Sequence, residues 1–106
     1  MYEDDEVSKF QLLYEDEDIT IVMEQAPSFM RGAFIHTNVR AFSKERYKKY
    51  KYVWNRLVGY LHSNNIHNIY ALPTDTKAEK WETKFGFVDT GVQYEGQKIM
   101  KYLGDL

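Results

Sequence analysis

The chain has 106 residues, of which 43% are hydrophobic and 16% aromatic, and this composition favours one globular domain over a disordered chain. It contains no cysteine, which excludes disulfides, thiolate metal sites and a cysteine nucleophile and favours a reducing, cytoplasmic location. No apolar run approaches the roughly 18 residues of a membrane span, so we expect no membrane insertion.

The first third of the chain predicts an acidic tail followed by strands. Residues 1–8 are interpreted as a flexible acidic N-terminus, which leaves a single domain over residues 9–106. Phe10–Tyr14 fits a strand or a short helical turn, because five residues are too few for periodicity to decide. The β-branched run Ile19–Met23 predicts a strand, and Gly32–Thr37 predicts a second strand that pairs with it in antiparallel fashion.

The clearest helix is predicted over residues 44–62. Its apolar residues recur at three- and four-residue steps and form one stripe: Tyr47, Tyr50, Trp54, Leu57, Val58 and Leu61. Ser43 is a suitable N-cap residue, and the sequence Ser63-Asn64-Asn65 indicates where the helix stops. This helix is therefore expected to pack one aromatic face against a sheet.

The last third predicts a strand around Tyr70, a helix over residues 74–84 and a hairpin of two strands, 88–93 and 97–103, which turns at Glu95-Gly96. Gly86 follows the helix at a position where a left-handed residue ends many helices, so Phe85 and Phe87 can both face the sheet. Two strands separated by one long helix suggest a right-handed parallel crossover. The predicted fold class is therefore α/β (α+β), with helices covering a twisted sheet.

The element order, with Lys84-Phe85-Gly86-Phe87 closing the second helix, resembles the GNAT superfamily of N-acetyltransferases. Ala78, Gly86 and Phe87 match the pattern of that family. The chain is most similar to the short GNAT-like proteins of tailed phages, of the internal virion protein type, in its basic long helix, its Thr74-Asp75-Thr76 step and its Gly96-Gln97 turn. The resemblance implies a mixed, mostly antiparallel sheet of five or six strands, packed with one long and one or two short helices.

The resemblance also implies acetyl-CoA as a possible cofactor, bound by a loop between a strand and the long helix. The residues at that junction which correspond to the cofactor site are Arg40, Ser43, Lys44 and Arg46. The family loop carries glycines whose backbone N–H groups hold the pyrophosphate, whereas this chain has none there and places Phe42 in the loop. The cofactor site is therefore expected to be degenerate.

The catalytic residues are left open by the sequence. Acetyl transfer needs a base to accept the proton of the amine and an acid to protonate the departing thiolate. The family uses a tyrosine as the acid, and Glu82 stands at that position, where a carboxyl group is a poor acid near neutral pH unless it is buried. Glu24, Tyr70 and Tyr94 are the other candidates. No histidine or acidic cluster has the spacing of a metal site.

The charge distribution suggests partners. Residues 1–24 carry nine acids and one base, whereas residues 31–56 carry eight bases and one acid. The two segments neutralise each other across the fold, are simply solvated, or steer an anion to one face. We favour a protein that acts through protein contacts in a virion or with a host factor in the cytoplasm, as a monomer or homodimer. A weakly active N-acetyltransferase is the first alternative, and nucleic-acid binding through the basic helix, residues 44–56, is the second and less favoured one.

Overall fold

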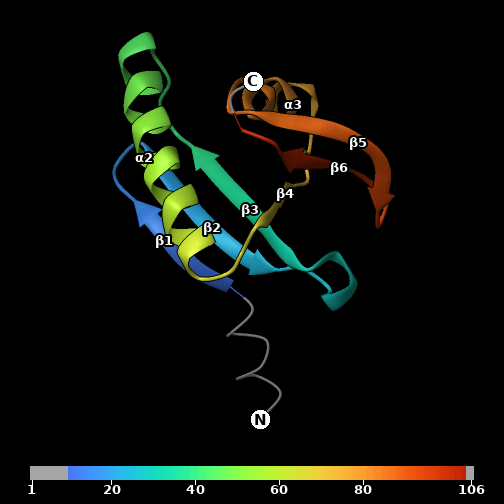
Figure 1. Ribbon diagram of the computed structural model, residues 1–106. Coiled ribbons are helices and arrows are strands. Elements are labelled where there is room, and N and C mark those ends of the chain that lie inside the picture. Colours follow the sequence, from blue (N-terminus) through green and yellow to red (C-terminus); the bar gives the residue numbers. More distant parts are fainter. Residues whose placement is uncertain (1–9, 105–106) are drawn as a thin grey trace.

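In the computed structural model, which describes residues 10–104, six strands form one sheet in the order β1-β2-β3-β4-β6-β5 (Figure 1). The strands are β1 (Phe10–Glu15), β2 (Ile19–Gln25), β3 (Gly32–Val39), β4 (Asn68–Ala71), β5 (Phe87–Tyr94) and β6 (Gln97–Tyr102). The helical elements are the short 3-10 helix η1 (Ser28–Met30), α2 (Lys44–Ser63) and α3 (Thr76–Lys84). The predicted N-terminal segment, residues 1–8, lies outside the described residues.

Strand pairing follows the predicted topology. β1, β2 and β3 form an antiparallel meander, which also decides that Phe10–Tyr14 belongs to a strand. β3 and β4 are parallel and are joined through α2, as the spacing of strand, long helix and strand predicted. β6 then pairs antiparallel with both β4 and β5. The mixed, mostly antiparallel sheet expected from the sequence is thus present.

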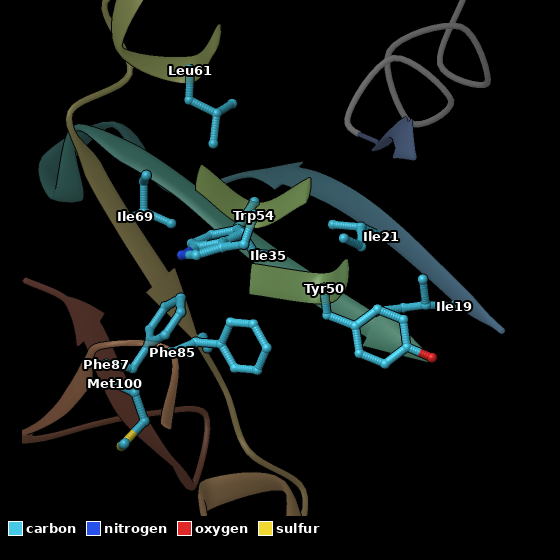
Figure 2. Packing of buried hydrophobic residues seen from close by; sticks show 11 residues of the cluster. Ile19, Ile21, Ile35, Tyr50, Trp54, Leu61, Ile69, Phe85, Phe87 and Met100 are labelled. Carbon is cyan, nitrogen blue, oxygen red and sulfur yellow. The ribbon is translucent and has the colours of Figure 1, made fainter. Parts of the chain in front are cut away.

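The core lies between the sheet and α2 (Figure 2). The α2 residues Tyr50, Trp54 and Leu61 are buried, as the apolar stripe predicted. Their neighbours in the core cluster come from five strands, β2 to β6, and from the residue after α3, and they include Ile19, Ile21, Ile35, Ile69, Phe85, Phe87 and Met100. Edge-to-face contacts of Trp54 with Tyr102 and of Tyr50 with Trp81 tie the long helix to β6 and α3.

The helix ends are set by local capping. The Ser43 hydroxyl accepts the N–H of Arg46 at 3.1 Å, which confirms the predicted N-cap of α2. The second helix begins at Thr76 and not at residue 74 as predicted, because the Asp75 side chain caps it by accepting the N–H of Ala78 at 2.7 Å. Among residues 10–104, neither helix has both the length and the apolar character needed to cross a membrane.

Gly86 and Gly96, two glycines in the C-terminal half, have a left-handed backbone conformation. Gly86 has a φ of 99°, the left-handed conformation predicted for it, and Phe85 and Phe87 on either side are both buried. A Cβ at Gly86 would lie 2.8 Å from the carbonyl oxygen of Gly104, so close backbone approach also requires glycine. Glu95 and Gly96 both have positive φ, which matches the two-residue hairpin turn predicted there.

Candidate functional site

An open cleft lies where the parallel strands β3 and β4 stop pairing. Their pairing covers only Gly32–Phe34 and Asn68–Tyr70, although β3 continues to Val39. The cleft has a volume of about 630 Å³, with residues 37 and 39–42 on one wall and residues from 74 to 84 on the other. It therefore lies at the carboxyl ends of two parallel strands, a frequent position of ligand sites in sheets of this kind.

One wall of the cleft is aromatic. Phe42 packs edge-on against Trp81 with ring centroids 5.0 Å apart, and Trp81 in turn lies 4.7 Å from the ring of Phe85. The ammonium group of Lys84 lies 5.8 Å from the centroid of Phe42. Phe42 thus covers part of the junction between β3 and α2, where the sequence predicted that a bulky side chain would hinder a diphosphate.

The wall formed by α3 is also basic. Lys77, Lys80 and Lys84 of α3 line the cleft, and the described residues give none of them an ion pair with a carboxylate. These lysines are not among the site residues predicted from the sequence. Their spacing of three and four residues places them on one side of a helix and was the available signal.

A small internal cavity of about 30 Å³ adjoins the cleft, and Thr37 and Trp81 line both. The rest of its lining is mostly apolar, with Ile19, Ile35 and Phe87 among its residues, and Glu82 is its one carboxylic acid. The Glu82 Oε1 atom is buried and has no hydrogen-bond partner among the described residues, and the same holds for Trp54 Nε1. An unpaired carboxyl group in apolar surroundings favours its neutral form.

Burial, and to a smaller extent the nearby carboxylate of Glu79, raises the pKa of Glu82 to about 7. A carboxyl group with this pKa carries a proton in a large share of molecules near neutral pH. From the sequence, Glu82 is expected to serve as an acid near neutral pH only if it is buried. The structure meets that condition at the Oε1 atom of Glu82.

The other catalytic candidates lie on the opposite face of the sheet. Glu24 and Tyr70 are both in register with Phe34, which alternates with the core residue Ile35. The Glu24 carboxylate lies 2.8 Å from His36 Nε2, and the Tyr70 hydroxyl donates to the carbonyl of Met30. The ring of Tyr94 packs 5.6 Å from that of Phe34. The sheet therefore separates these three residues from Glu82.

The residues predicted for the cofactor loop are engaged mainly within the chain. The Arg40 guanidinium lines the cleft but donates to the carbonyls of Asp16 and Glu17 and to the Thr20 hydroxyl. Ser43 caps α2 with its side-chain oxygen, and Lys44 is exposed. The side chains of Arg40 and Ser43 therefore make contacts that serve the fold.

Ion pairs hold the start of α2 against the turn between β1 and β2. Arg46 Nε lies 3.0 Å from Asp18 Oδ2, and Lys49 Nζ contacts both Asp16 and Asp18 at 2.9 and 3.2 Å. The hydrogen bond from Lys49, followed by that from Tyr14, holds the pKa of Asp16 well below its usual range. The expected neutralisation between the acidic and basic segments thus occurs at these residues.

The described residues contain no group of three or more histidine or acidic side chains arranged to hold a metal ion. Comparisons with family models, with curated proteins and with solved structures find no match to this chain. The candidate site therefore rests on its own geometry: a basic and aromatic cleft that leads to a buried carboxyl group.

Proposed function

We propose that the chain is a reduced GNAT-like domain that binds an acyl-CoA-type ligand in the cleft between the end of β3 and α3, and that it lacks the full catalytic set for efficient transfer. The observation that carries the proposal is the lysine-lined cleft that adjoins the cavity of Glu82. The parallel crossover through α2 and the left-handed Gly86 after α3 support the resemblance in fold.

The residues of the cleft suit the two chemical parts of such a ligand. Coenzyme A carries phosphates at one end, for which Lys77, Lys80 and Lys84 supply positive charge. Its long neutral arm needs an apolar surface, which Ala78 and Trp81 supply beside residues 39–42. The bound group would supply a thioester-activated acyl group, and Glu82 is the side chain placed to hold a proton beside the cleft.

The same geometry argues against efficient transfer. Glu24, the candidate base, lies on the far face of the sheet and is bonded to His36. The loop before α2 offers no glycine, and its Ser43 oxygen already accepts the N–H of Arg46. We therefore expect ligand binding that is weaker than in a complete acetyltransferase, together with little turnover.

A thermal-shift titration with acetyl-CoA tests this function. A ligand that binds only the native state at a tenfold excess over its Kd adds about 1.4 kcal/mol of stability, or about 6 °C in Tm for a domain of this size. The double variant Lys77→Glu/Lys80→Glu is expected to abolish the shift, whereas Lys48→Glu, an equal change per site outside the cleft, is expected to retain it. No rise in Tm at millimolar acetyl-CoA would contradict the proposal, and release of free thiol with an amine acceptor measures any turnover.

A second candidate is that the domain acts through protein contacts, in a phage particle or with a host factor. The face of the sheet opposite α2 and α3, here called the open face, supports it, because Phe10 and Leu12 are 54% and 56% exposed there. We expect the unchanged chain to cross-link to a partner in particles or host extract, and the variant Leu12→Asp to lose that cross-link. Equal cross-linking by both proteins would count against this candidate.

A further inference from the structure

The solvent side of α2 carries cations and an aromatic ring at regular spacing. Lys44, Lys48, Tyr52 and Arg56 follow one another at four-residue steps and are all exposed, and we call these four residues the basic stripe. Tyr52 is 62% exposed, so its ring is available for contact from solvent. The stripe lies across the helix from the buried Tyr50 and Trp54, and no other element covers α2 on that side in the described part of the chain (Figure 1).

The charges of the stripe are distinct from those that the fold neutralises. Arg46 and Lys49, on a neighbouring side of α2, are paired with Asp16 and Asp18. Lys44 and Lys48 have no ion pair with any residue between 10 and 104, and the Arg56 guanidinium lies over the ring of Tyr52, 5.8 Å from its centroid. The stripe therefore presents three positive charges, one of them resting on an exposed aromatic ring.

The dimensions of the stripe define what fits it. Four residues of helix rise about 6 Å, so the three steps from Lys44 to Arg56 span about 18 Å. In an extended peptide, side chains on the same side repeat at about 6.6 Å. Acidic residues at alternate positions of such a peptide therefore match the cations of the stripe, and an apolar residue between them meets Tyr52.

We propose that the basic stripe of α2 is a docking surface for a short, extended acidic segment of a partner protein, with carboxylates at alternate positions and an apolar side chain near its centre. This surface lies outside the cleft and does not depend on the proposed ligand. Its chemistry is that of charge-assisted contacts arranged around one aromatic anchor.

The surroundings of the stripe favour a short peptide over a nucleic acid. Glu45 lies beside Lys44, and the exposed Glu17 lies in the turn that Asp18 joins to Arg46 at the same end of α2. A long polyanion that ran past the stripe would meet these carboxylates.

Fluorescence anisotropy with the full chain tests the proposal. The probe is a labelled peptide of alternating glutamate and alanine with one central phenylalanine, measured at low salt, where surface charges are least screened. The peptide is expected to bind, and the same peptide with glutamine in place of glutamate is expected not to bind. The reversal Lys48→Glu/Arg56→Glu is expected to weaken binding at least about tenfold. Tyr52→Ala is expected to weaken it by a smaller factor, and Arg31→Glu, a reversal outside α2, is expected to leave it unchanged.

Three results would overturn the proposal. They are absence of binding by the glutamate peptide, equal binding by the reversed variant, and tighter binding of a single-stranded oligothymidylate that the same reversal abolishes. The last result would assign the stripe to nucleic acid. Amide chemical shifts of the unchanged protein supply a second measurement that does not depend on the folding of any variant, since the glutamate peptide must perturb residues along the exposed side of α2.

Discussion

The two faces of the sheet differ in what covers them and in how their polar groups are satisfied. The face under α2 and α3 holds the aromatic core, yet it leaves the Glu82 carboxyl buried without a partner. On the open face, Glu24 is hydrogen-bonded to His36, and the Tyr70 hydroxyl is hydrogen-bonded to the carbonyl of Met30. Phe10 and Leu12 remain exposed there. The covered face therefore holds the fold together, and it also carries Glu82, the one acid among residues 10–104 with a buried oxygen that lacks a hydrogen-bond partner.

Unpaired buried acids are costly, and a fold that needed only stability gains nothing from one. The contrast with Asp16 is instructive, because that acid also faces α2 but receives Lys49 and Tyr14 as partners, and its pKa falls accordingly. Glu82 has no such partner, and its pKa rises. Asp16, which has partners, thus stabilises the fold. Glu82, whose pKa is shifted without a partner, is the better candidate for a functional group.

The largest effect is expected from Trp54 at the centre of the covered face. Trp54 is 4% exposed and packs against Phe87 and Tyr102, so Trp54→Ala is expected to lower the free energy of unfolding by about 3–5 kcal/mol. Because Trp54 Nε1 has no hydrogen-bond partner among the described residues, Trp54→Phe is expected to cost less. Urea denaturation measures both, and a loss below about 1 kcal/mol for the alanine variant would place the core elsewhere.

An intermediate effect is expected from Glu82, and it depends on pH. Since the pKa of Glu82 is about 7 in the folded chain and its ordinary value is 4.5, the folded state binds a proton more tightly within this window. The free energy of unfolding therefore decreases as pH rises from about 4.5 to 7, and after discounting for partial exposure the loss is about 1–2 kcal/mol. Glu82→Gln is expected to remove this loss, which makes the variant more stable than the unchanged chain at pH 8 and about equal at pH 4.5.

The control for Glu82 is Glu79, which lies on the same helix and is paired with Lys98 at 2.9 Å. Glu79→Gln removes a paired carboxylate, so the dependence of stability on pH between 4.5 and 7 is expected to persist in that variant, at most reduced. Chemical denaturation at several pH values measures the free energy of unfolding of the unchanged chain and of the two variants. If the free energy of unfolding of Glu82→Gln fell with pH as steeply as that of the unchanged chain, another group would titrate in this window.

Elements with local signals could be predicted from the sequence, and contacts between distant segments could not. The stripe of Tyr50, Trp54 and Leu61 predicted α2, and Gly86 predicted the end of α3, because both signals lie within a few residues. The cleft joins residues 37–42 to the lysines of α3 more than thirty positions later, and only the parallel crossover brings them together. The burial of Glu82 likewise depends on packing among α2, α3 and four strands, which no local pattern records.

The smallest effect is expected at Leu12. Comparing it with its neighbour Leu13 tests the difference between the two faces of the sheet directly. Leu12 is 56% exposed on the open face, whereas Leu13 packs against the core cluster. Leu12→Ala is therefore expected to change the free energy of unfolding by less than about 0.5 kcal/mol, and Leu13→Ala to lower it by about 1–2 kcal/mol. The same chemical change is made at neighbouring positions of an edge strand, Leu12 in the paired register and Leu13 at the register shift, so the larger loss is expected at the position whose side chain is packed. Equal losses would mean that the open face is covered in solution, and a loss at Leu12 that grows with protein concentration would identify a second copy of the chain as the cover.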